Sequence, residues 1–236
     1  MDTALKVVAV LPWLDWVALA AFGIGWAGYV WFASSRAQTH LSILATTNRI
    51  RHDWMLQMTY REVRVVDGVV IQNLSTSPSF FASTTILIIG GLLAVLSTTD
   101  KAHERVRELP FAAQTSVLVF DLKTLLLLVI FVYAFFRFTW SMRQYTFGAL
   151  LVASAPESEV FDAKGLSREA FANKAGRVVS LAAETFNDGL RAYYFAFAAM
   201  AWFVSPIAFL LGTAMVVFVL YRREFRSDVL DILNAE

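Results

Sequence analysis

Four long apolar stretches dominate the chain, and two polar segments separate the first stretch from the second and the third from the fourth. An α-helix of about 20 residues crosses the roughly 30 Å of hydrocarbon in a bilayer, and each stretch is close to that length or longer. Hydrophobic residues make up 58% of the sequence, whereas about 45–50% is typical of soluble domains. The sequence therefore predicts an all-α, polytopic membrane bundle of four transmembrane helices, with two largely helical segments on the cytoplasmic side.

The whole chain, residues 1–236, is expected to form a single membrane domain. The expected spans are residues 12–33, 78–97, 117–138 and 193–221, and the expected polar helical segments are residues 34–76 and 141–192. Ser77 and Pro78 suit a helix start, because the serine oxygen can accept from the first N–H groups and the proline needs no donor there. Pro206, near the middle of the fourth span, predicts a kink because an interior proline removes a helical hydrogen bond.

Several classes of function find no support in the sequence. The chain has no cysteine, three histidines and a formal net charge of +1, so we expect no metal, no cofactor and no nucleic acid partner. It also lacks the phosphate-binding loop, the paired-glycine dinucleotide fingerprint, and the HExxH and GxSxG motifs of enzymes. We therefore expect a protein that is not an enzyme, and whose partners are the lipid bilayer and either a second copy of itself or another membrane protein.

The distribution of lysine and arginine favours one orientation in the membrane. With four spans, the side that carries both polar segments holds about twelve of these residues, and the opposite side holds about eight. Because basic residues accumulate on the cytoplasmic side, we expect both ends of the chain outside and both polar segments in the cytoplasm. The basic residues Arg222, Arg223 and Arg226, directly after the fourth span, favour the reverse orientation.

The third span carries charged residues inside the membrane. Asp121 and Lys123 lie in its first turns and Arg137 lies at its end, and a lysine in mid-membrane costs about 2.5–3.5 kcal/mol on insertion scales. Lys123 and Arg137 are fourteen residues apart, which places them within about 40° on one helical face. Together with Ser83 and Thr84 of the second span, they predict a path for a solute or an anion. The alternatives are that the two cations reach opposite membrane surfaces or form structural ion pairs.

Small residues mark one face of the second span. Gly90, Gly91 and Ala94 recur at helical spacing, and in lipid such residues let two backbones approach closely. We therefore expect this face to pack against another helix. A hydroxyl-lined path along the same span, through Ser79, Ser83 and Thr84, is the alternative.

Polar residues gather where the polar segments meet the membrane. The candidates for a polar cluster on the cytoplasmic face are Arg61, Arg64, Arg143, Asn187, Asp188 and Arg191. Asp188 and Arg191 are three positions apart on one helix and can form a pair. The cluster is either a structural hinge at the membrane edge or a contact for a substrate or a lipid headgroup. Helix starts in the same place would add to an electropositive face.

Several motifs resemble one uncharacterised family. They are RHDWM at 51–55, SFFASTTIL at 79–87, FTWS at 138–141 and FNDGLRAYY at 186–194. The pattern is similar to that of a bacterial membrane family, the domain of unknown function 599, over nearly the whole chain. The resemblance implies a multi-pass protein of the bacterial inner (plasma) membrane, and it implies no activity.

Three functions remain compatible with these features. The first is an oligomeric channel or transporter for small solutes, anionic ones included, because four helices of one copy enclose little space. The second is an accessory or assembly subunit that binds a larger membrane complex through its small-residue and aromatic faces. The third is a membrane enzyme with a site in a loop. The charged face of the third span and the basic cluster favour the first.

Overall fold

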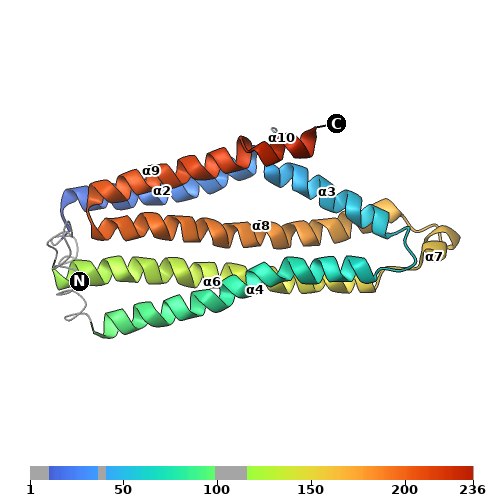
Figure 1. Cartoon of the computed structure of the whole chain (residues 1–236), viewed down its shortest axis with the longest axis horizontal. Helices are drawn as coiled ribbons and strands as arrows, with labels where there is room; N and C mark the ends of the chain where they lie inside the picture. Colours follow the sequence, from blue (N-terminus) through green and yellow to red (C-terminus); the bar gives the residue numbers. More distant parts are fainter. Residues whose placement is uncertain (1–10, 37–40, 99–115, 236) are drawn as a thin grey trace. The chain divides into compact units, whose positions relative to one another are not determined.

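The structure is a computed structural model, and it describes residues 11–36, 41–98 and 116–235 (Figure 1). All regular secondary structure in these residues is helical. The helices are α2 (Trp13–Arg36), α3 (Ile43–Met58), α4 (Val65–Ser97), α6 (Val117–Ala153), α7 (Ser158–Ala163), α8 (Arg168–Met200), the short 3-10 helix η1 (Ala201–Phe203), α9 (Pro206–Phe225) and α10 (Asp228–Asn234). The predicted all-α fold is confirmed, and four described segments, beginning with α2, α4, α6 and α9, are long and apolar enough to cross a membrane.

The chain divides into two compact units. Unit 1 takes Met1–Arg36, Thr85–Ala134 and Leu190–Arg223, and unit 2 takes Ala37–Thr84, Phe135–Gly189 and Glu224–Glu236. The helices α4, α6 and α8 are longer than a membrane crossing requires, and each contributes one part to each unit. An apolar window in the sequence marks only the part of a helix that suits lipid, and it does not mark where the helix ends.

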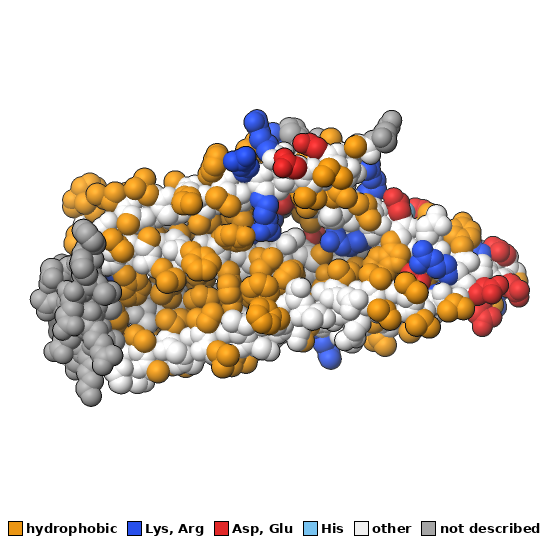
Figure 2. All heavy atoms as spheres, in the orientation of Figure 1, with side chains coloured by type: hydrophobic (Ala, Val, Ile, Leu, Met, Phe, Trp, Pro, Cys, Tyr) orange, Lys and Arg blue, Asp and Glu red, His pale blue; other side chains and the backbone are white. Residues whose placement is uncertain are grey.

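The second half of α8 forms the centre of unit 1. Its buried residues are Ala192, Phe195, Ala196, Ala198 and Ala199. Their small side chains let neighbouring helices approach closely, as is common in membrane bundles. Phe22 and Trp26 of α2 pack on Phe195 with ring centroids 5.5 Å and 5.1 Å away. Figure 2 shows hydrophobic side chains over much of the visible face of these helices.

The helical segments of unit 1 alternate in direction along the chain (Figure 1). Asp15, near the start of α2, meets Trp202, just after the end of α8, so these two helices are antiparallel. Phe32, near the end of α2, meets Tyr221, near the end of α9, so these two helices are parallel. Within the described residues, unit 1 thus contains five α-helical segments besides the short η1, and α2 and α9 finish at the same end of it.

The structure differs from the predicted fourth span, residues 193–221. There α8 ends at Met200, η1 follows, and α9 begins at Pro206 and returns alongside α8 (Figure 1). Ser205 Oγ accepts a hydrogen bond from the N–H of Ala208 at 3.0 Å, so the serine–proline pair starts a new helix. Gly212 of α9 approaches α8 so closely that a Cβ would lie 3.4 Å from the Cα of Ala198. The predicted kink is therefore a helical hairpin.

The start of α4 also differs from the prediction. The helix begins at Val65 and continues through Pro78, which was expected to be its first residue. Ile71, Pro78 and Ala82 are buried and recur on one face of the helix. Packing of this face holds the helix together across a residue that removes one of its hydrogen bonds.

Unit 2 has a core of its own, built from α3, α4, α6, α8 and the residue Ala155 after α6. The core residues are Met55, Met58, Ile71, Tyr145, Val152, Ala155, Ala172, Ala175, Val179 and Ala182. Gly176 allows α8 to approach α3, since a Cβ there would lie 3.1 Å from the Cα of His52. Both polar segments are largely helical, as predicted.

Candidate functional site

Lys123 of α6 is buried in unit 1, with 2% of its surface exposed. Its Nζ donates to the backbone carbonyl of Trp202 at 2.8 Å and lies 5.3 Å from the ring centroid of Trp202 and 5.9 Å from that of Phe203. A ring face attracts a cation within about 6 Å, and the end of α8 leaves backbone carbonyls without helical partners. The turn between α8 and α9 thus holds the lysine inside the bundle.

The same tryptophan contacts a buried acid. Nε1 of Trp202 donates to Oδ1 of Asp15 at 2.5 Å, and Asp15 is 4% exposed. Trp202 therefore links the lysine of α6 to the carboxylate of α2. This geometry favours the structural alternative for Lys123. Asp15 and Trp202 were not among the predicted site residues. Asp15 is the one acid within the first predicted span, and an acid inside a membrane span indicates a buried partner.

Arg137 of α6 forms an ion pair with Asp188 of α8 in unit 2. Both side chains are partly exposed, whereas Nε of Arg137 is buried and meets no hydrogen-bond partner among the described residues. The next residues along the two helices, Phe138 and Gly189, are in such close contact that a Cβ on the glycine would overlap the ring. The second cation of the predicted anion path is thus engaged by an acid of the predicted cytoplasmic cluster.

The other residues predicted for a solute path belong to different units. Asp121 is partly buried in unit 1. Ser83 is exposed in unit 2, and Thr84, also in unit 2, donates from its hydroxyl to the backbone carbonyl of Phe80 at 2.9 Å. A path that uses all these side chains stays a prediction.

The small residues of α4, Gly90, Gly91 and Ala94, are exposed. A Cβ added to either glycine would meet nothing within 4 Å in the described chain. The apolar window of α4 is 11% buried, compared with 22–44% for the other three candidate spans. The predicted helix contact is therefore not made by the described part of this chain. Spacing marks a packing face, but it does not say whether the partner helix belongs to the same molecule.

In unit 2, Asp67 of α4 fixes the loop that follows α3. It is 1% exposed, and its Oδ1 accepts from Nε1 of Trp54 at 2.7 Å and from Arg61. Arg64 donates to two backbone carbonyls in the loop after α6, each at 2.5 Å. Two arginines of the predicted cluster thus connect loops within unit 2.

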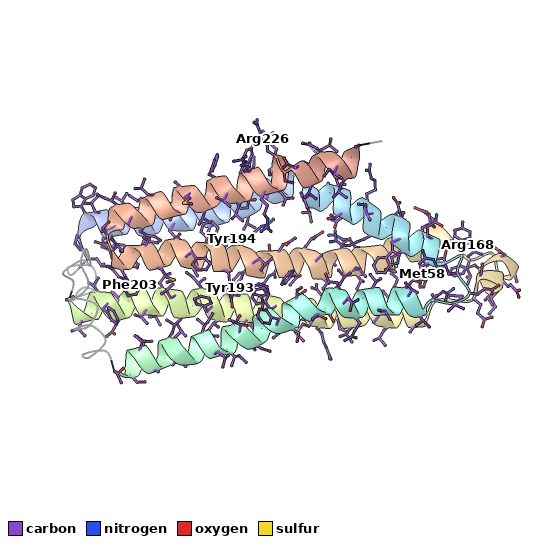
Figure 3. All side chains as sticks on the ribbon, in the orientation of Figure 1. Met58, Arg168, Tyr193, Tyr194, Phe203 and Arg226 are labelled. Carbon is purple, nitrogen blue, oxygen red and sulfur yellow. The ribbon has the colours of Figure 1, made fainter. Side chains whose placement is uncertain are left out.

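Arg168, the first residue of α8, has a similar role that the sequence analysis missed (Figure 3). It donates to the backbone carbonyl of Thr59 at 2.5 Å and to Oδ1 of Asp162 at 2.9 Å. Its guanidinium lies 4.4 Å from the ring centroid of Tyr60 and 4.9 Å from that of Phe161. An arginine in the first turn of a helix is unfavourable near the positive end of the dipole, which is a sequence signal for such a tertiary role.

The rest of the predicted cytoplasmic cluster is divided between the units. Arg143 is exposed on α6, with its guanidinium 5.8 Å from the ring of Phe147 one turn later. Asn187 is partly buried in the part of α8 that belongs to unit 2. Arg191 lies in unit 1, 5.6 Å from the ring of Tyr29. The pair between Asp188 and Arg191 stays a prediction.

A separate polar network joins α3 to α8 in unit 2. Asn48 accepts from Arg51 at 2.9 Å and donates to Glu184 at 2.9 Å. Burial lowers the pKa of Arg51 from its usual value, and the charges of Tyr145 and Glu184 act in the opposite direction. The network holds a partly buried cation in place on the inner side of α3.

Charge is distributed unevenly along unit 1. Three arginines lie over aromatic rings, with Arg36 5.3 Å from Phe32, Arg191 5.6 Å from Tyr29, and Arg223 5.6 Å from Tyr194. They lie where α2 and α9 finish, and we call this the arginine end. The acids among the described residues of unit 1 are Asp15 and Asp121, which lie near the start of α2 and of α6. The arginine end therefore gathers these arginines away from the two described acids and from Lys123.

Comparison with known proteins agrees with the motifs. The model of a family described as "Protein of unknown function, DUF599" matches residues 17–229. No curated protein and no solved structure matches the chain. The resemblance inferred from the sequence motifs is thus confirmed, and the description of the family assigns it no activity.

Proposed function

The chain belongs to the DUF599 family of proteins of unknown function, and on that premise we propose that it is a membrane assembly protein. It binds a second copy of itself within the bilayer through Gly90, Gly91 and Ala94 of α4, which we call the glycine face. In this role the protein is a subunit of a membrane complex, and it neither conducts a solute nor catalyses a reaction. The exposure of the glycine face carries the proposal.

Two adjacent glycines in the middle of a helix lower its stability. Each costs about 1 kcal/mol relative to alanine, and no described residue comes within 4 Å of the Cβ position of Gly90 or Gly91. A single copy therefore gains no described packing from them. In lipid, such residues stabilise contacts between two closely packed backbones. The loss of helix stability is offset when a second helix lies on the glycine face.

The spacing of the glycine face suits a symmetric pair. Ala94 follows Gly90 by four residues, which is the small-xxx-small pattern of helices that cross closely. Leu87 and Leu93 flank the face and are exposed, so they can pack into the facing helix. A two-fold dimer uses the same surface on both copies. A second copy therefore supplies a complementary surface without any further partner.

A channel or transporter is less well supported by the described contacts. Its basis in the sequence was the shared helical face of Lys123 and Arg137. Lys123 donates to the backbone of Trp202, and Arg137 is paired with Asp188. An anion would have to displace these partners before it could bind either cation.

The alternating segments of unit 1 support an orientation in the membrane. If all five segments cross, Arg222, Arg223 and Arg226 lie on the same side as the two polar segments. That side then holds fifteen of the twenty lysines and arginines. Because basic residues accumulate on the cytoplasmic side, the segments of unit 2 are cytoplasmic in our proposal, and the membrane is the inner (plasma) membrane of a bacterium. The basic residues at the end of α9 no longer oppose this orientation.

Single cysteines test the glycine face, because the chain has no cysteine of its own. A disulfide needs Cα atoms about 4.4–6.8 Å apart, a distance that closely packed helices offer. After mild oxidation of membranes, Ala94→Cys is expected to form a covalent dimer. Leu92→Cys, two residues away and on the opposite face of α4, is the matched control and is expected to stay monomeric.

A second substitution separates association from folding. Gly90→Leu in the Ala94→Cys background is expected to abolish the covalent dimer, because the leucine side chain blocks close approach. The stability of the monomer in detergent should not fall and should rise by up to about 1 kcal/mol, because leucine is a better helix former than glycine. Equal crosslinking from Leu92→Cys and Ala94→Cys, or none from either, would contradict the proposal. Solute flux through liposomes that contain the protein would favour the channel instead.

A further inference from the structure

An apolar groove runs along unit 1 between α2 and α9, which lie side by side (Figure 1). Its volume is about 750 Å³. Its lining extends from Ala21 to Phe32 on α2 and from Leu210 to Tyr221 on α9. The two helices meet at the floor of the groove, where a Cβ on Gly25 would lie 3.2 Å from the side chain of Thr213. The groove is therefore a surface feature of one unit, and both of its walls are apolar helices.

The groove is as long as one leaflet of a bilayer is thick. On each helix the first and last lining residues are eleven positions apart, which corresponds to about 16 Å at 1.5 Å per residue. The hydrocarbon core of a bilayer is about 30 Å thick, so one leaflet takes about 15 Å. The groove finishes at Phe32 and Tyr221, which belong to the arginine end. Its length and position match the leaflet next to that end.

Polarity changes along the groove. Most of the lining is apolar, and the hydroxyl of Thr213 donates to a backbone carbonyl of its own helix at 2.8 Å. Two lining rings at the arginine end have cations over them, Arg36 over Phe32 and Arg191 over Tyr29. The acids among the described residues of unit 1 lie at its other end, and Glu224, in the last turn of α9, belongs to unit 2, where it accepts from the N–H of Leu44 at 3.0 Å. The groove is thus apolar along its length and has two arginines over its rings where it finishes.

We propose that this groove binds one molecule of an anionic phospholipid. One acyl chain lies along the groove, and the phosphate lies beside Arg36 and Arg191. The occupant follows from the two properties of the site, because an anionic phospholipid combines a chain of one-leaflet length with a negative headgroup. A neutral phospholipid carries a cation beside its phosphate and would gain less from the arginine end, and a transmembrane helix would fill the apolar part without a phosphate. The site uses α2 and α9, so it is independent of the glycine face on α4.

The test measures the thermal stability of the full-length protein in nanodiscs of two compositions. One contains phosphatidylcholine alone, and the other contains phosphatidylcholine and phosphatidylglycerol in equal parts. A ligand that binds the folded state raises the melting temperature, so the wild type is expected to melt higher with phosphatidylglycerol. Gly28→Leu should abolish this difference, because Gly28 lines the groove and has space for a side chain. Gly23→Leu, with equal space on the same helix but outside this groove, should retain it.

A pair of charge variants tests the headgroup contact. Arg36→Gln is expected to weaken the binding of a spin-labelled phosphatidylglycerol about fivefold, the factor for one basic residue near a membrane surface. Arg143→Gln is the control, because Arg143 is an exposed arginine of unit 2 that lies over Phe147 and takes no part in the groove or the arginine end. Equal weakening by both would mean general surface attraction and would overturn the proposal. So would a wild type without preference for phosphatidylglycerol, a Gly28→Leu variant that keeps it, or displacement of the lipid by inorganic phosphate.

Discussion

The backbone carbonyl of Trp202 accepts a hydrogen bond from Nζ of Lys123 at 2.8 Å, and both residues are buried. This contact joins α6 to the turn between α8 and α9, across 79 positions of sequence. The indole of the same tryptophan donates to Asp15, so a cation and an anion from two other helices meet at one residue. The charge of the lysine is thereby held within unit 1, where it fixes the position of the turn.

Lys123→Met is expected to destabilise the fold by about 3–5 kcal/mol, because it leaves the carboxylate of Asp15 buried near Trp202 without the nearby cation. Asp15→Asn in the same chain should recover most of the loss, since replacing both members of a buried pair is close to neutral. Unfolding of the wild type, the two single variants and the double variant gives a double-mutant cycle. Strictly additive effects would show that the two residues act independently.

Gly189→Ala is expected to lower the stability of unit 2 by about 1–3 kcal/mol, the usual cost of overpacking a filled core. The reason is that a Cβ at this position would overlap the ring of Phe138. Gly68→Ala is the matched control, because a Cβ there meets nothing within 4 Å, and it should raise stability by about 0.4–1 kcal/mol. Thermal melting in detergent compares the two. A gain from both substitutions would mean that Phe138 moves aside without cost.

Asp67→Asn is expected to destabilise the protein by about 1–3 kcal/mol, because it removes the charge that pairs with Arg61 and places a buried amide NH₂ where Oδ2 has no described hydrogen-bond partner. Asp53→Asn is the control, since Asp53 is 65% exposed and its change should stay within about 0.5 kcal/mol. Urea unfolding followed by tryptophan fluorescence measures both. Equal stability of the two variants would show that the buried carboxylate does not hold the loop after α3.

Labelling of single cysteines tests the five-crossing orientation. Trp13→Cys is expected to react with an impermeant thiol reagent in intact cells, because Trp13 is exposed at the start of α2. Glu159→Cys and Ile232→Cys should react only after lysis. Ile232 is the informative position, because a chain with four crossings would put it on the same side as Trp13. Reaction of Ile232→Cys in intact cells would show that α8 does not cross.

The helical hairpin between α8 and α9 is a feature that local sequence composition does not predict. Helices, apolar windows and the start of the third span were predictable, because each depends on local composition. The turn after α8 was missed because its residues Trp202, Phe203 and Val204 are as apolar as the helices on either side. Pro206 was recognised as a disruption, but a kink and a helix start share the same residue pair. Only the packing of α9 on α8 distinguishes the two.

The candidate sites illustrate a related limit. Helical spacing identified Lys123 and Arg137 as residues that need partners, and it identified Gly90 and Gly91 as a packing face. It did not identify the partners, because periodicity within one helix says nothing about which helix lies opposite. The carbonyl of Trp202 is a backbone group, which no side-chain pattern reveals. Asp188 was recognised, but its pairing with Arg137 depends on how α6 and α8 align.

The contact between Asp15 and Trp202 can form only after both residues have been synthesised. The two residues are 187 positions apart, and ribosomes add about 5–20 residues per second, so about 10–40 s separate their synthesis. During that interval α2 is complete but has no indole to donate to its carboxylate. Asp15 lies in the first turn of α2, so its carboxylate can stay at the membrane surface while the rest of the helix enters the lipid. The first described helix to be made therefore gains the partner of its buried acid only when the turn after α8 is made, after the residues that pack on its rings.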